Sequence, residues 1–312
     1  MDRAHESPYH APVMVEEMLR YLEPANEGKY LDGTLGGGGH SEAILSRCAG
    51  CEVIAVDRDP EAIGEAGSRL ARFGSRVRMV LSNFSTAMAA AGIENGSLSG
   101  VLLDLGISSH QVDEAERGFT FRIGAPLDMR MESSSTGGES AADLLNTLPE
   151  EELASIFRRY GEEKRARHMA RIVGEMRERA PFERSEQLVE TVERAIPRAT
   201  VQDKARIFQA MRIAVNREIE ALEEALPKFR EGLAAGGVLV VLSYHSLEDR
   251  VVKDAFREWS RACICPPQLP VCMCRGAPLG ETLTRKPLFA SEAETCVNSR
   301  ARSVRLRAWR RA

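Results

Sequence analysis

The residue pattern that points most clearly to chemistry is a run of glycines framed by two acidic side chains. Asp32 opens the segment DGTLGGGG, which ends at Gly39. Glycines that follow a strand permit a tight turn, and they leave backbone amides bare to a ligand at the start of the next helix. Asp57 stands at the tip of the next apolar run, about 20 residues after the glycines, where a carboxylate can accept both hydroxyls of a ribose. A turn that binds nothing is the alternative, although four consecutive glycines are a costly way to build one.

The arrangement of the glycines favours S-adenosylmethionine over a nicotinamide dinucleotide. The dinucleotide pattern G-x-G-x-x-G, with small residues leading into it, is not what stands here. Instead, Asp32 opens the loop, and a carboxylate there suits the ammonium group of a ligand better than a pyrophosphate. Phe84 follows the third apolar run and is placed to flank an adenine, whereas core packing is its alternative role. Asp32, the glycines and Asp57 together predict S-adenosylmethionine as the cofactor.

Four of the seven cysteines form a tight cluster of two C-x-C pairs, Cys263 with Cys265 and Cys272 with Cys274. Four thiolates in such a cluster could hold zinc. Because zinc-binding pairs usually have C-x2-C spacing, a reduced cysteine-rich loop is the alternative, and the sequence assigns no metal. Cysteines of a cytosolic chain are expected to be thiols or metal ligands and not disulfides. The same expectation applies to the three scattered cysteines, which are Cys48, Cys51 and Cys296.

The elements that must position these residues alternate between strand and helix in the first part of the chain. Apolar runs appear at residues 30–31, 53–56, 77–81 and 101–103, and helical stretches lie near 41–48 and 61–72. Uninterrupted apolar strands separated by helices are typical of a parallel sheet that is covered on both faces. Right-handed crossovers then make a doubly wound, Rossmann-like α/β layer the simplest architecture.

The strand signals stop near residue 113, and helical spacing takes their place. Leu153, Ile156, Phe157 and Tyr160 form one apolar set at helical spacing, and a second set follows Gly161. Helical sequence between two α/β halves predicts an inserted all-helical subdomain over residues 113–204. The α/β core is then expected to comprise residues 1–112 and 205–312.

The α/β pattern resumes after this insertion. Apolar residues from Met211 to Leu226 predict one long helix that is stopped by Pro227. A buried strand is expected at Val238–Leu242. Apolar and basic residues alternate over 303–309, and this alternation predicts a half-exposed strand near the end of the sequence.

Composition narrows the function classes. The 312 residues include 43% hydrophobic and 28% charged residues, which is ordinary globular usage and excludes a disordered or collagen-like chain. No apolar run approaches the roughly 20 residues of a membrane helix, and the N-terminal segment lacks the apolar core of a signal peptide. A cytoplasmic protein with no membrane partner is therefore expected. The net charge of −4 does not indicate nucleic-acid binding, so that interpretation depends on local clusters.

Longer motifs connect the chain to a known family. The motifs are LDLGISSHQ from Leu103, ERGFTF from Glu116, PLDMRM from Pro126, YGEE from Tyr160, FQAMRIAVN from Phe208, SYHSLEDR from Ser243 and NSRARS from Asn298. This set closely resembles the bacterial ribosomal RNA small-subunit methyltransferase H family, also called MraW. The resemblance covers nearly the whole chain, from His10 to the C-terminal arginines.

The resemblance implies a class I S-adenosylmethionine-dependent methyltransferase that methylates N4 of one cytidine in 16S ribosomal RNA, within the small ribosomal subunit. It also implies cofactor contacts, which map onto Gly38, Gly39, His40, Asp57, Phe84, Asp104 and Gln111. Asp32 and Gly36 join this set as members of the same glycine loop. Two features depart from the family pattern. Tyr244 stands where members commonly have phenylalanine, and residues 263–274 lie outside the shared motifs.

Asp104 is the residue that we expect to carry catalysis. Because the N4 amine of cytosine is conjugated with the ring, its lone pair is poorly available to attack a methyl group. An acceptor for the N–H protons can hold the amine in attacking geometry and stabilise developing positive charge. Asp104, at the end of the fourth strand, is placed to be that acceptor. His245 is the second catalytic candidate, expected to act as a polar anchor near the substrate, since no G-x-S-x-G elbow supports a hydrolase.

A cytosine that leaves its stack needs an aromatic partner, and its strand needs phosphate contacts. Phe119, Phe121 and Tyr244 are the stacking candidates, although core packing is the alternative for each. The candidates for phosphate contacts are Arg117, Arg130, Arg250, Arg300, Arg302, Arg305, Arg307, Arg310 and Arg311. A solvated face is the alternative, above all for the last two of these arginines.

Two other functions remain open at this point. A methyltransferase that acts on DNA or a small molecule would use the same fold, and the net charge of −4 is compatible with it. A non-catalytic RNA-binding assembly factor that retains a cofactor pocket belongs to a different class. Methylation assays on naked RNA, DNA and assembled small subunits distinguish the three.

Overall fold

The computed structural model describes residues 12–107, 114–132, 138–265 and 273–312. The chain divides into two compact units, which are described separately. The first unit contains Met1–Gly106 and Ile219–Ala312, and the second contains Ile107–Glu218. The second unit therefore extends beyond the predicted insertion of residues 113–204 at both ends.

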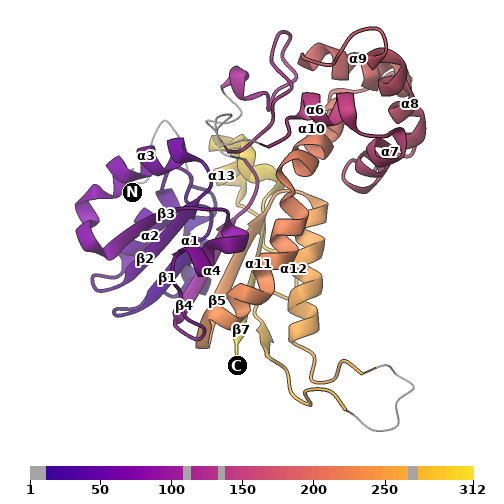
Figure 1. Cartoon of the computed structure of the whole chain (residues 1–312). Coiled ribbons are helices and arrows are strands. Elements are labelled where there is room, and N and C mark those ends of the chain that lie inside the picture. The colour runs from indigo at the N-terminus through magenta and orange to yellow at the C-terminus, as the bar shows by residue number, and fades with distance from the viewer. Residues whose placement is uncertain (1–11, 108–113, 133–137, 266–272) are drawn as a thin grey trace. The chain divides into compact units, whose positions relative to one another are not determined.

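The first unit is built on one sheet, whose strand order in the described part of the chain is β3-β2-β1-β4-β5-β7-β6 (Figure 1). The strands are β1 Lys29–Asp32, β2 Glu52–Asp57, β3 Val77–Leu81, β4 Leu98–Asp104, β5 Leu233–Ser243, β6 Gly280–Thr282 and β7 Arg305–Arg311. The strands β1 to β5 pair in parallel, whereas β7 runs antiparallel to both of its neighbours. This sheet confirms the predicted doubly wound α/β layer.

Helices cover both faces of the sheet. Alternate side chains of a strand point to opposite faces, so apolar residues on both faces need a helix to pack against them. On one face, α1 (Val15–Leu22), α2 (Gly39–Arg47) and α3 (Pro60–Leu70) share a core with Leu102 and Leu242. On the other face, α4 (Ala87–Ala90), α11 (Glu218–Gly232) and α12 (Ser246–Trp259) share a core with Leu103 and Val241. The shorter helices of this unit are η1 Ala71–Arg76, η2 Phe84–Thr86, α13 Glu292–Val297 and η5 Ser299–Ser303.

The register of the parallel strands places three predicted site residues at one edge of the sheet. Asp32 ends β1 and is the register partner of Leu102 in β4, and Asp104 ends β4 beside Leu242. Asp57 ends β2, the other neighbour of β1. The carboxyl ends of such strands are where doubly wound sheets bind ligands.

The helical sequence around Arg217 forms two helices and not the single one that was predicted. Helix α10 covers Val201–Asn216, and α11 begins at Glu218. Arg217 has a left-handed φ of 50°, which ends α10. Asn216 holds that end in the second unit, because its side chain bonds the backbone of Met129 and Met131 at 2.7 and 2.8 Å. The prediction that Pro227 stops the helix is wrong, since Pro227 lies inside α11.

The strand β7 is more buried than the half-exposed strand that was predicted. Arg307 is only 6% exposed, because Asp249 accepts from its Nε at 2.6 Å and from its Nη2 at 3.2 Å. A two-pronged contact of this kind satisfies a buried guanidinium. The alternation of apolar and basic residues in β7 therefore does not show that the basic side chains are exposed to solvent. Arg307 is no longer a candidate for phosphate contact.

Cys48 and Cys51 form a disulfide in the structure. The prediction that these two cysteines are thiols is therefore wrong. Helix α2 ends at Arg47 and β2 begins at Glu52, so the short connection holds the two Cα atoms 5.7 Å apart, within the range that disulfides span.

The second unit is helical in its described residues, apart from an isolated bridge between Pro126 and Arg184. Besides α10, its helices are η3 Ala115–Arg117, α6 Ala141–Thr147, α7 Glu150–Arg159, α8 Ala166–Arg177 and α9 Ser185–Ala195. They enclose a core of their own that includes Phe157, Met169 and Phe208. In the described part of the whole chain, no helix is long and apolar enough to cross a membrane.

Candidate functional site

The glycine loop, residues 33–39, turns by means of two glycines with positive φ. Gly36 has a φ of 50° and Gly38 a φ of 79°, a conformation that strains any residue with a side chain. The Leu35 amide donates to the Val56 carbonyl of β2 at 2.9 Å, which ties the loop to the sheet. Gly39 then begins α2. The loop thus delivers the N-terminus of a helix to the carboxyl edge of the sheet, where backbone amides can meet an anion.

Asp57 is joined directly to this loop. Its Oδ2 accepts the Gly36 amide at 2.8 Å, and its Oδ1 accepts the Asp59 amide at 2.9 Å. Burial raises the pKa of Asp57 to about 6, although these two amide donors oppose the shift. The carboxylate is therefore ionised at neutral pH, and a second lone pair on each oxygen is the acceptor that a ribose would use. The ribose contact itself stays a prediction.

Asp32 is fully buried, and its contacts are with its own loop and with α2. Its Oδ1 accepts the Thr34 amide at 3.2 Å, and its Oδ2 accepts the Ser41 hydroxyl at 2.7 Å. Burial raises the pKa of Asp32, and the hydrogen bond from Ser41 partly offsets that shift. These contacts make Asp32 a residue that shapes the loop, whereas its contact with a ligand's ammonium group stays a prediction.

Asp104 lies in a small cluster of polar side chains that are largely shielded from solvent. Its Oδ1 accepts the Tyr244 hydroxyl at 2.8 Å, and its Oδ2 is 3.6 Å from His40 Nδ1. His40 Nε2 is 2.9 Å from the Val13 carbonyl, which can only accept, so we assign a proton to this nitrogen. The side chains of His40 and Asp104 are 5% and 9% exposed. The hydrogen bond from Tyr244 therefore orients the Asp104 carboxylate, with the His40 ring beside it.

Tyr244 makes a contact with Asp104 that the sequence did not reveal. Sequence reasoning named it only as a stacking candidate, but its hydroxyl donates to Asp104. Burial, and then the charge of Asp104, raise the pKa of Tyr244 well above its ordinary value, so the phenol stays a donor at physiological pH. One signal was present in the sequence. Tyr244 follows directly after β5, whose register places Leu242 beside Asp104.

The glycine loop is also hydrogen-bonded to β4, and Phe84 lies beside the loop. The Asp104 amide donates to Thr34 Oγ1 at 2.6 Å, a contact that sequence reasoning missed. Phe84 begins η2 after β3 and is half-buried. A Cβ added to Gly33 would lie 3.5 Å from the Cβ of Phe84, so the aromatic residue is a close neighbour of the loop.

His245, the second catalytic candidate, is the N-terminal cap of α12. Its Nδ1 accepts the Glu248 amide at 3.4 Å, and Glu248 Oε2 accepts the His245 amide at 3.3 Å. The same Oε2 accepts the Tyr244 amide at 2.8 Å. Glu248 thus fixes the segment that carries Tyr244 and His245, while the catalytic role of His245 stays a prediction. Gln111 lies outside the described residues.

The second unit contains two stacking candidates, Phe119 and Phe121, and two candidates for phosphate contact, Arg117 and Arg130. Phe121 is 37% exposed and meets Phe208 edge to face, with ring centroids 5.7 Å apart. Arg130 is paired with Asp128, whose Oδ1 accepts from its Nε at 2.9 Å. Arg117 donates to the Met131 carbonyl at 2.9 Å. The two arginines therefore contribute to the local structure of this unit.

Known proteins match this chain over nearly its whole length. Residues 7–312 match the model of the family described as the MraW methylase family. The ribosomal RNA small subunit methyltransferase H of Gemmatimonas aurantiaca is 51% identical over 307 residues, which cover 97% of this chain and 96% of that protein. The protein of the same name from Heliobacterium modesticaldum is 50% identical over 308 residues, covering 96% of this chain and 97% of its own. The chain therefore belongs to the MraW methylase family, and its sheet has the class I fold of S-adenosylmethionine-dependent methyltransferases.

Proposed function

We propose that this protein transfers a methyl group from S-adenosylmethionine to N4 of one cytidine in 16S ribosomal RNA. The names of its relatives at 51% and 50% identity, ribosomal RNA small subunit methyltransferase H, support methylation of small-subunit ribosomal RNA. The observation that carries the finer proposal is the carboxylate of Asp104. It ends β4 next to the glycine loop, and Tyr244 holds one of its oxygens.

The glycine loop supports the cofactor part of the proposal. S-adenosylmethionine supplies a methyl group that is activated by a positively charged sulfur. In this assignment, Asp57 accepts the ribose hydroxyls and Phe84 flanks the adenine. The Gly38 amide donates to the Leu35 carbonyl and closes the loop, and the Gly39 amide at the start of α2 meets the carboxylate of the cofactor's amino-acid part. Asp32 keeps the loop in the required shape.

Asp104 acts on the incoming amine in this proposal. The N4 lone pair forms the new bond to the methyl carbon while the electrons of the carbon–sulfur bond pass to sulfur, and the amine then loses a proton. A carboxylate that accepts an N–H of the amine stabilises the positive charge that develops on nitrogen. The Tyr244 hydroxyl donates to Oδ1 of the same carboxylate and orients it.

The helical second unit is proposed to shape the surface that receives the RNA. The partial exposure of Phe121 supports this assignment, because single unstacked bases are commonly bound on aromatic side chains. A variant in which a short linker replaces the unit should still bind S-adenosylmethionine if the first unit folds, but it should not methylate the RNA. Methylation at the normal rate by that variant would exclude the role.

Nucleoside mass spectrometry of 16S RNA from cells that lack this protein tests the function. We expect the loss of one N4-methylated cytidine, restored by the unchanged protein and not by the Asp104→Ala variant. Purified protein with labelled S-adenosylmethionine should label assembled small subunits or naked 16S RNA. Label in DNA alone would favour the DNA methyltransferase, and no label in any substrate would favour the non-catalytic assembly factor.

A further inference from the structure

We propose that Cys263, Cys265 and Cys274 bind a zinc ion that orders the connection between α12 and β6. This connection, residues 260–279, is called the cysteine loop below. Its described residues contain no helix or strand. Long segments without secondary structure are uncommon in compact domains unless they have a function or something else orders them.

Hydrophobic packing does not order the described residues of the two C-x-C pairs. Ile264 is 45% exposed and Met273 is 83% exposed, so the apolar side chains within the two C-x-C pairs face solvent. Cys263 is itself exposed, and Cys265 and Cys274 are half-buried. These cysteines are therefore not members of the apolar core, and apolar packing does not explain why the two C-x-C pairs lie together.

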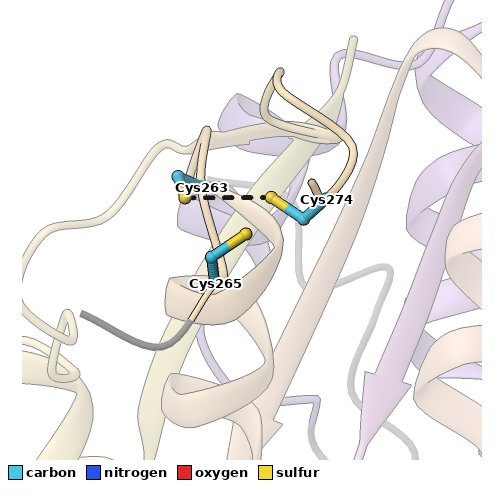
Figure 2. Close-up of side chains that lie close together, drawn as sticks. All are labelled: Cys263, Cys265 and Cys274. Carbon is cyan, nitrogen blue, oxygen red and sulfur yellow. Dashed lines mark hydrogen bonds between the residues drawn. The ribbon is translucent and has the colours of Figure 1, made fainter. Parts of the chain in front are cut away.

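The three sulfur atoms converge at one point, as Figure 2 shows. All three lie within 4.8 Å of one another, and the Sγ atoms of Cys274 and Cys263 are 3.8 Å apart. Two sulfurs on a tetrahedral zinc ion, each at a zinc–sulfur distance of about 2.3 Å, are separated by roughly 3.8 Å. The sulfur geometry therefore matches a tetrahedral thiolate site, although the C-x-C spacing differs from the usual C-x2-C.

A backbone amide of each C-x-C pair donates a hydrogen bond to a sulfur atom of the other pair. The Ile264 amide, from the first C-x-C pair, donates to Cys274 Sγ at 3.3 Å. The Met273 amide, from the second pair, donates to Cys265 Sγ at 3.4 Å. Neutral thiols are weak acceptors, whereas thiolates are the form that binds a metal and is stabilised by such donors.

The three thiolate ligands indicate which metal the site binds. Thiolates prefer zinc, copper(I) and iron–sulfur clusters over magnesium or calcium, which need oxygen ligands. Zinc fits best, because three thiolates at tetrahedral spacing leave one coordination position for a further donor. Cys272 lies outside the described residues and is not part of the assignment. The proposed ion is structural, and it lies on the α12–β6 connection and not in the glycine loop.

Metal analysis of the untagged chain, purified without chelators, is the first test. We expect about one zinc ion per chain, as structural sites hold. Cys263→Ser, Cys265→Ser and Cys274→Ser should each reduce the zinc content to about a tenth or less, because the remaining thiolates no longer form the site. Cys296→Ser is the matched control, since Cys296 is an exposed cysteine in α13 and should leave the zinc content unchanged.

Two further measurements keep the proposal testable if a variant expresses poorly. Cobalt added to the metal-free chain should give the sulfur-to-metal absorption and strong visible bands of tetrahedral thiolate coordination. Zinc should slow hydrogen exchange at the amides of Ile264 and Met273 and leave S-adenosylmethionine affinity unchanged. A chain without zinc and without cobalt–thiolate absorption would overturn the proposal, and iron with acid-labile sulfide at these cysteines would overturn the choice of zinc.

Discussion

The glycine loop and the cysteine loop belong to the same unit, but they are ordered by different means. The glycine loop is bonded to the strands on both sides, through Leu35 to Val56 and through Thr34 to Asp104. In the cysteine loop, Ile264 and Met273 are exposed, and three sulfur atoms lie close together instead. Hydrogen bonds can fix a polar site where a buried sheet edge shields them from water, whereas a solvated loop needs stronger bonds.

The comparison makes the two regions separable by experiment. Changes at the sheet edge should affect the cofactor or the reaction and leave the zinc content unchanged. Changes at the three cysteines should remove zinc and leave cofactor affinity unchanged. The predictions below all concern the sheet edge and run from the largest expected effect to the smallest, with zinc content as the shared control.

The largest effect is expected for Asp104→Asn. The amide keeps the shape of the side chain but removes the charge that balances the positive amine, and preorganised groups of this kind are worth on the order of 10²–10³ in rate. Single-turnover methylation at saturating S-adenosylmethionine should show this loss while calorimetry shows nearly unchanged cofactor affinity. Near-normal single-turnover rates for Asp104→Ala would remove Asp104 from the catalytic residues.

Asp57→Ala should weaken cofactor binding and leave the rate at saturation nearly unchanged. Losing hydrogen bonds to a charged acceptor costs roughly 1.5–3 kcal/mol, which is about tenfold or more in affinity. Isothermal titration calorimetry with S-adenosylmethionine measures the change. An affinity equal to that of the unchanged protein would refute the ribose assignment.

Binding of S-adenosylmethionine should depend on pH through Asp57. The pKa of this carboxyl in the folded chain is about 6, so lowering the pH through that value protonates the acceptor and weakens binding. Only the ionised form is a full acceptor for the ribose, so affinity should fall by up to about tenfold per pH unit below the pKa. Asp57→Asn should show weaker binding with a flat profile, and a sloping profile in that variant would assign the pH dependence to another group.

The pH dependence of folding stability through Asp57 should be opposite to that of cofactor binding. Cofactor binding weakens as the pH falls, whereas the stability of the free protein falls as the pH rises. The pKa of Asp57 is raised from 3.8 to about 6 on folding, so the folded chain holds more protons than the unfolded chain between these values. The contribution of Asp57 to the free energy of unfolding should therefore fall as the pH rises through this window in the absence of cofactor. Urea unfolding of the unchanged protein and of Asp57→Asn at several pH values measures the difference in stability, which should stop changing with pH below about pH 4.

Tyr244→Phe should give the smallest effect. It removes one hydrogen bond to Asp104, and the resemblance noted above includes members that have phenylalanine at this position. We expect a several-fold decrease in single-turnover rate at saturating S-adenosylmethionine, because the carboxylate loses one donor that orients it. A rate decrease as large as that of Asp104→Asn would show that the phenol itself takes part in the reaction.

The sequence predicted the parts of the fold and the site that depend on local pattern. Apolar runs located the strands, and Asp32, Asp57 and Asp104 could be placed because each follows such a run directly. The hydrogen bond between Tyr244 and Asp104 joins residues 140 positions apart, and the local sequence around either residue does not predict this contact.

Other errors have the same origin in long-range contacts. The pair of Arg307 and Asp249 turned an expected surface arginine into a buried one. The break at Arg217 carries no glycine or proline signal, and it became visible only with the left-handed φ of that residue. Helix and strand periodicity reports which face of an element is buried, but it does not report which polar group will be neutralised by a partner from elsewhere in the chain.

The position of β7 in the sheet has a consequence for the order of folding. In the described residues, β6 pairs only with β7, although β6 comes first along the chain. Strand β6 therefore cannot join the sheet until β7 has paired with β5, which requires closing the segment between Ser243 and Arg305. Closing so long a segment costs entropy before any contact repays it, and such pairings form slowly. A metal ion captured early by the cysteine loop would shorten this segment and speed the last step of folding.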